Sequence, residues 1–107
     1  MEYLAYFAAG AFLANGIPHF VSGISGKYFP SPFAKPPGVG ESSPVVNVLW
    51  GSANLIVGWA LVTRVGEFTT GFSSDMLLLV IGFCGMALVL AWHFGRVRNK
   101  LQGDKGE

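Results

Sequence analysis

Three long runs of residues without any charge dominate the sequence. No Asp, Glu, Lys or Arg occurs in Tyr3–Gly26, Ser42–Thr63 or Met76–Phe94. A helix needs about 20 mostly apolar residues to cross the hydrocarbon layer of a membrane, and each run is close to that length or longer. The pattern therefore predicts an all-α integral membrane protein, a single domain with three transmembrane helices.

The helix ends follow from proline and capping residues, which predict helices at about 2–20, 44–64 and 74–96, a loop at 21–43 and a tail at 97–107. Pro18 lacks a backbone donor and disfavours helix at the residue before it, so the first helix should kink or stop there. Ser43 followed by Pro44 is typical of a capped helix start. Asp75 suits the positive end of the third helix.

The basic residues are distributed unevenly around the three runs. Six of the seven lie in the 21–43 loop or from Arg96 onward, and only Arg64 lies between the second and third helices. Loops rich in Lys and Arg stay in the cytoplasm. We therefore expect a multi-pass protein of the bacterial inner membrane with the N-terminus outside and the C-terminus cytoplasmic. The start of the chain has no basic segment before the first run, so that run should remain as an uncleaved anchor.

The 21–43 loop is rich in glycine and proline, which argues against a helix or a central strand. It also carries three large aromatic residues, which a solvated linker would not: Tyr28, Phe29 and Phe33. Two interpretations remain open, an ordered loop at headgroup depth and a re-entrant flap that lines a cavity. Lys27 and Lys35 favour the first, because charges resist deep insertion.

Small and amide residues form a stripe on the second helix, at Asn47, Gly51, Asn54 and Gly58. Their spacing of three and four residues places them on one helical face. Such a stripe is typical of a packing seam, within the subunit or between subunits, and the alternative is a polar lining for a pore or pocket.

The third helix has a similar small-residue stripe at Ala87, Ala91 and Gly95, another expected site of close helix contact. Three helices bury little surface by themselves, so we expect a homo-oligomer or a larger membrane complex.

Polar side chains inside a membrane are costly, so the few present are the candidate pore or pocket residues: Asn15, His19, Asn47, Asn54 and His93. The proposed threading places His19, His93 and Asn47 near the cytoplasmic end, where they would form one cluster if the bundle closes. Two imidazoles can ligate haem or a divalent metal, or relay a proton. Two histidines without a third ligand favour simple packing at the interface instead, so no metal or cofactor is expected.

Several other function classes find no support in the residues. A net charge of +1 argues against binding to nucleic acid. No nucleophile elbow, phosphate-binding loop or paired cysteine motif occurs, and the single cysteine, Cys84, is expected to pack as a small apolar residue.

The segment Gly16-Ile17-Pro18-His19-Phe20, the pair Pro36-Pro37 and the run Gly51–Gly58 resemble the DoxX-like group of small bacterial membrane proteins. The likeness covers about residues 10–63. DoxX-like proteins usually have four membrane helices, whereas this chain has three. The resemblance implies an association with redox or quinone-linked membrane complexes, with His19 as the residue of interest.

The expected function is therefore that of an accessory or homo-oligomeric structural subunit without catalysis of its own. One alternative is a channel or transporter for ions or small solutes, lined by Asn15, Asn47 and Asn54. The other is a DoxX-like redox protein that uses His19 and His93 with haem or quinone.

Overall fold

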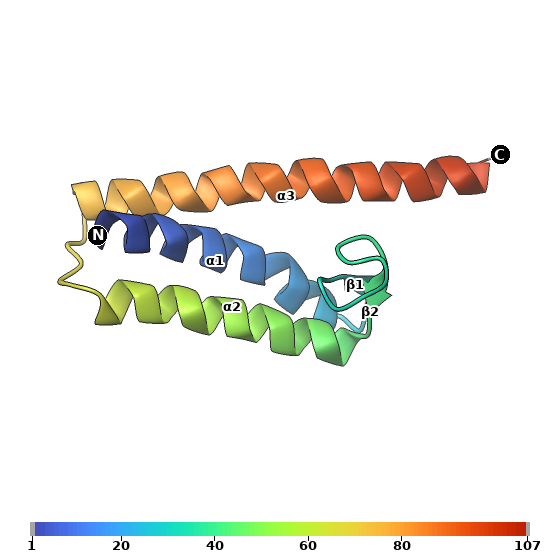
Figure 1. The fold of residues 1–107 in the computed structure, drawn as a ribbon, viewed down its shortest axis with the longest axis horizontal. Coiled ribbons are helices and arrows are strands. Elements are labelled where there is room, and N and C mark those ends of the chain that lie inside the picture. The colour runs from blue at the N-terminus through green and yellow to red at the C-terminus, as the bar shows by residue number, and fades with distance from the viewer. Residues whose placement is uncertain (1, 107) are drawn as a thin grey trace.

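The computed structural model describes the backbone of residues 2–106 and the side chains of residues 2–100. It contains three helices, α1 (Glu2–Ile24), α2 (Pro44–Arg64) and α3 (Ser74–Gly106), and a two-stranded antiparallel ribbon of β1 (Phe29–Pro30) and β2 (Glu41–Ser42). The helices form an elongated bundle measuring 52 × 24 × 21 Å. Helix α1 lies between α2 and α3 and runs parallel to α3, while α2 runs the opposite way (Figure 1).

All three helices are long and apolar enough to span a membrane; in α3 the candidate span is Ser74–Lys100. The expected all-α fold with three helices is confirmed. The parallel course of α1 and α3 brings the end of α1, the start of α2 and the middle of α3 to the same end of the molecule as the ribbon (Figure 1).

Helix α1 continues through Pro18 to Ile24. The sequence predicted a kink or a stop at Pro18, and the stop is wrong. The reason lies in the packing of the segment after the proline. Gly23 is buried so closely against the start of α2 that a methyl group on it would lie 2.6 Å from the carbonyl oxygen of Pro44. This close packing holds the last turns of α1 in place, although Pro18 cannot donate to the helix.

Helix α2 begins at a serine cap, since the Ser43 hydroxyl accepts a hydrogen bond from the Val46 N–H and Pro44 occupies the first turn. The buried residues of α2 are the four of the small and amide stripe: Asn47, Gly51, Asn54 and Gly58. A methyl group on Gly51 would lie 2.5 Å from the Phe20 nitrogen, and one on Gly58 would lie 2.7 Å from the Leu13 side chain. The stripe thus forms the α1–α2 interface inside the subunit.

The α1–α3 interface depends on two other glycines. A methyl group on Gly10 would lie 2.0 Å from the Leu79 carbonyl oxygen, and one on Gly82 would lie 2.0 Å from the Phe7 carbonyl oxygen. Ala87 and Ala91, expected in a close-contact stripe, are instead exposed. Gly95 also faces open space.

The expected tail continues α3 as helix as far as Gly106. Lys, Arg, Gln and Leu are good helix formers, and the segment Arg96–Leu101 contains no glycine or proline to end the helix. Glu107 lies outside the described residues, as does Met1.

The connection between α1 and α2 is folded on itself rather than extended. Ser31 accepts hydrogen bonds through its carbonyl oxygen from the Ala34 and Gly38 N–H groups, and its hydroxyl lies 2.6 Å from that of Ser42. Gly38 has a φ of 74°, a backbone conformation that glycine adopts without a Cβ penalty. The result is a compact loop held at the ribbon end of the bundle.

Candidate functional site

Asn47, near the start of α2, joins the ribbon and α1 to α2 through the hydrogen bonds of its side chain. Its side chain is fully buried, and its amide nitrogen donates to the carbonyl oxygens of Phe29 and Ser42 at 3.0 and 3.1 Å, with Ser43 O a further acceptor at 3.1 Å. Phe29 and Ser42 are also a pair of partners across the ribbon. One amide therefore fastens both strands to α2.

His19 of α1 makes a hydrogen bond with the same Asn47 side chain. Its Nδ1 lies 2.9 Å from the Asn47 side-chain oxygen, and the imidazole is only 2% exposed. Carbonyl oxygens accept and never donate, so the backbone partners fix which end of the Asn47 amide is nitrogen. Asn47 Oδ1 is then an acceptor and His19 Nδ1 must donate the proton. In the neutral ring this leaves Nε2 as an acceptor, and it makes no hydrogen bond to any described residue.

Asn15 and Asn54 form a second amide pair between α1 and α2, one level further from the ribbon. Asn15 Nδ2 donates to Asn54 Oδ1 at 3.0 Å, and Asn54 Nδ2 donates to the Trp50 carbonyl oxygen at 2.8 Å. The same reasoning leaves the side-chain oxygen of Asn15 as a free acceptor.

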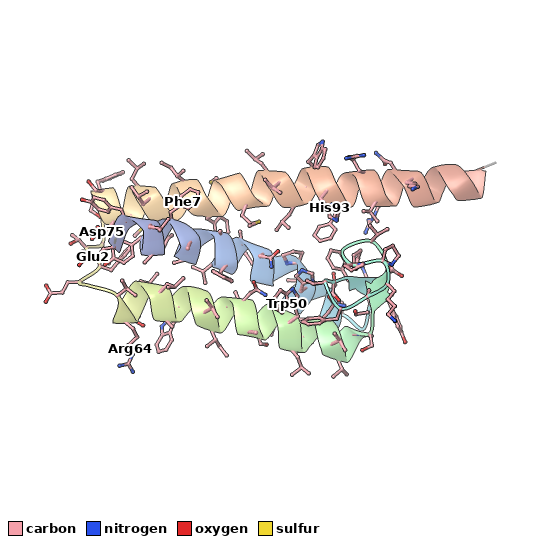
Figure 2. All side chains as sticks on the ribbon, in the orientation of Figure 1. Glu2, Phe7, Trp50, Arg64, Asp75 and His93 are labelled. Carbon is pink, nitrogen blue, oxygen red and sulfur yellow. The ribbon has the colours of Figure 1, made fainter. Side chains whose placement is uncertain are left out.

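His93 joins α3 to the loop. Its Nε2 donates to the Gly38 carbonyl oxygen at 2.7 Å, so Nδ1 of the neutral ring is an acceptor. Figure 2 shows His93 projecting from α3 toward the loop, with Trp50 near the same loop on α2. His93 makes no hydrogen bond with His19 or Asn47 in the described part of the chain. The three residues expected in one cluster therefore share an end of the bundle but not one hydrogen-bond network.

Aromatic rings surround His19 on the sides that Asn47 leaves open. The imidazole makes edge contacts with Phe29 at 5.4 Å, Phe94 at 6.1 Å and Trp50 at 6.4 Å between ring centroids. Phe29 in turn lies 4.7 Å from Phe94. These contacts join the ribbon to all three helices, so the loop closes this end of the bundle.

A pocket of about 340 Å³, open to the outside, lies beside these residues. Its wall includes the free-acceptor residues Asn15, His19 and His93, together with Trp50 and, from the loop, prolines and Ser31. The Trp50 indole nitrogen is buried without a hydrogen-bond partner. A buried unpaired donor costs about 1–3 kcal/mol, and a molecule in the pocket would not reach this nitrogen, because it has almost no accessible surface.

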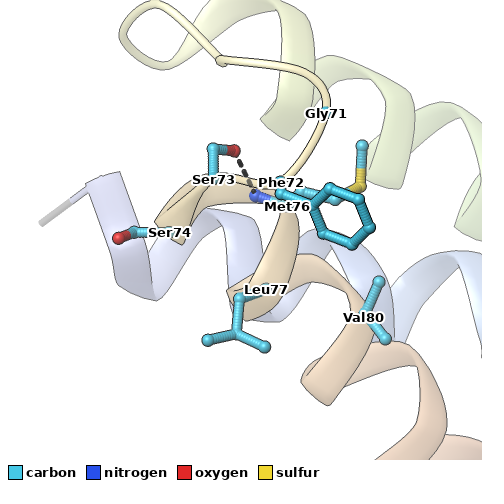
Figure 3. A pocket seen from close by; sticks show the side chains of 7 residues that line it. All are labelled: Gly71, Phe72, Ser73, Ser74, Met76, Leu77 and Val80. Carbon is cyan, nitrogen blue, oxygen red and sulfur yellow. Dashed lines mark hydrogen bonds between the residues drawn. The ribbon is translucent and has the colours of Figure 1, made fainter.

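A larger hollow of about 530 Å³ lies at the opposite end, where α3 begins (Figure 3). Its wall consists of Gly71, Phe72, Ser73, Ser74, Met76, Leu77 and Val80. The Ser73 hydroxyl accepts from the Met76 N–H as the cap of α3. The lining contains no ionisable side chain, so the smaller cavity near the ribbon is the better candidate site.

The structure thus brings four of the five candidate polar residues onto the α1–α2 seam, and the fifth, His93, onto the facing side of the same cavity. The His, Cys, Asp and Glu side chains among the described residues form no group of three that could hold a metal ion. Sequence reasoning missed Trp50 as a site residue. It also missed Tyr6, which is fully buried and donates to the Val65 carbonyl oxygen at 2.7 Å.

No protein-family model, curated protein or solved structure matches this chain.

Proposed function

We propose that this protein is a multi-pass integral protein of the bacterial inner membrane that acts as an accessory subunit, in a homo-oligomer or a larger membrane complex, without catalysis of its own. The observation that carries the proposal is the uneven coverage of the helices. The candidate spans of α1 and α2 bury 33% and 22% of their residues, whereas that of α3 buries 6%. Helix α3 therefore offers a full apolar face to lipid or to another membrane helix.

The outer face of α3 has features of a helix-packing surface. Ala87 and Ala91 are exposed, and Gly95 has open space where a side chain would lie. Their spacing of four residues places them on one face of the helix. Small residues let helix backbones approach closely in membranes. The sole cysteine, Cys84, is exposed and lies on the same face, seven residues before Ala91.

The channel alternative is less well supported by the hydrogen bonds. Asn47 and Asn54 are 0% and 2% exposed, and both side-chain ends of each amide are engaged within the protein. Amides that are used up in joining α1 to α2 do not offer a solvated path. The redox alternative, implied by the DoxX-like resemblance, would have to use the free nitrogens of His19 and His93.

Cross-linking through Cys84 tests the accessory role directly. In native membranes, a thiol-specific bifunctional reagent should yield either a dimer of the 11.4 kDa chain or one discrete larger adduct. The matched control carries the thiol on α2 instead, as Cys84→Ser combined with Ile56→Cys, because Ile56 is also exposed. Absence of any discrete adduct from Cys84, or equal adducts from both positions, would contradict a specific α3 interface.

Placement in the membrane has its own test. Because six of seven basic residues belong to the α1–α2 connection and the end of α3, we expect both regions on the cytoplasmic side. A reporter active only in the cytoplasm should work when fused after Glu107 and fail when fused before Met1. Activity at both ends, or recovery of the protein from membranes without detergent, would overturn the three-span arrangement.

A further inference from the structure

We propose that the cavity at the ribbon end is a binding site for a small lipophilic molecule bearing a hydroxyl group, an alcohol or a phenol. This goes beyond the accessory role, which needs no ligand. The cavity, about 340 Å³ in volume, lies within the size range of small-molecule sites. Its exposed rim residues Pro32 and Pro37 make it reachable from outside the bundle.

The free polar groups of the wall define the ligand's hydrogen-bonding part. His19 Nε2 is an acceptor, because Nδ1 donates to Asn47. Only 2% of the His19 residue is exposed. A ligand that pairs with His19 Nε2 must donate a hydrogen bond, and a hydroxyl is a small uncharged group that can do so.

The rest of the wall favours an apolar body on the ligand. Leu90 and Phe94 of α3, with Pro30 of the ribbon, face the same space as Trp50. No Lys, Arg, Asp or Glu lines the cavity, so a charged ligand would find no opposite charge there. The second acceptors, on Asn15 and His93, leave room for one further donor on the ligand.

The two histidines make the binding visible by NMR. In full-length protein labelled with ¹⁵N-histidine in lipid nanodiscs, the free state should show His19 protonated at Nδ1. Titration with 2-naphthol should then shift the His19 Nε2 resonance upfield and saturate, because that nitrogen becomes a hydrogen-bond acceptor. At equal membrane concentration 2-methylnaphthalene, which has the same shape without the hydroxyl, should produce no such shift.

The proposal is overturned by an absent or unsaturable shift, or by equal shifts from both probes. Either result would mean that the pocket does not recognise a hydroxyl group.

Discussion

Replacing Gly82 by alanine should separate α3 from α1 and lower the free energy of unfolding by about 3 kcal/mol, roughly a hundredfold change in the folding equilibrium. The added methyl group would lie 2.0 Å from the Phe7 carbonyl oxygen and 2.9 Å from its carbonyl carbon. Both are backbone atoms within a helix, so neither can move aside as a side-chain end would. The helices would have to move apart and lose the contacts along their length.

Gly85→Ala provides the matched control, because it lies three residues further along α3 and faces open space. It should leave stability unchanged or slightly raised, since alanine favours a helix more than glycine does. Reversible unfolding of each variant in mixed detergent micelles, followed by helix signal, measures the difference. If Gly82→Ala is as stable as Gly85→Ala, the close approach of α1 and α3 does not exist.

The contrast between these two glycines also explains why the sequence predicts one helix interface and not the other. On α2, amides and glycines alternate at helical spacing among bulky residues, so the packing face is visible as the stripe from Asn47 to Gly58. Helix α3 is apolar on all sides between Met76 and Trp92. The sequence of such a helix has no hydrophobic period that distinguishes one face from another. That Gly82, and not Ala87, packs against α1 follows only from its close contact with Phe7 in the structure.

The candidate site was predictable to a similar, partial extent. Polar residues inside apolar runs pointed to His19, Asn47 and His93, and the helix directions placed them at one end. The bond from His93 to Gly38 was beyond prediction, because it depends on how the loop folds between the helices. Trp50 could not be predicted as a site residue for a related reason. It lines the pocket only because the loop folds back beside it.

Replacing Asn47 by leucine should release the ribbon from α2 with a loss of about 3 kcal/mol or more. Leucine fills a similar volume, so the change removes hydrogen bonds without opening a large cavity. It would leave the buried His19 Nδ1–H without its partner, and it would remove one of the hydrogen bonds to the Phe29 and Ser42 carbonyl oxygens, which are also paired across the ribbon. Each buried group left unpaired costs about 1–3 kcal/mol. The Ser43 carbonyl oxygen is less affected, because the Asn47 backbone N–H still reaches it.

Asn54→Leu is the control, since it removes an amide at the next level of the same seam. Asn54 bonds one side chain, Asn15, and a carbonyl oxygen of its own helix at Trp50. Its replacement should cost about 1 kcal/mol, the usual value for a side-chain hydrogen bond between membrane helices. The loop should remain closed in this variant, because no bond from Asn54 reaches the ribbon.

Hydrogen exchange of the full chain in nanodiscs distinguishes the two variants. The Gly38 N–H, which is bonded to the Ser31 carbonyl oxygen inside the loop, should exchange much faster in Asn47→Leu and at the parent rate in Asn54→Leu. Equal protection of that amide in both would show that Asn47 does not hold the loop. The aromatic contacts of Phe29 with His19 and Phe94 would then have to be sufficient to close the bundle end by themselves.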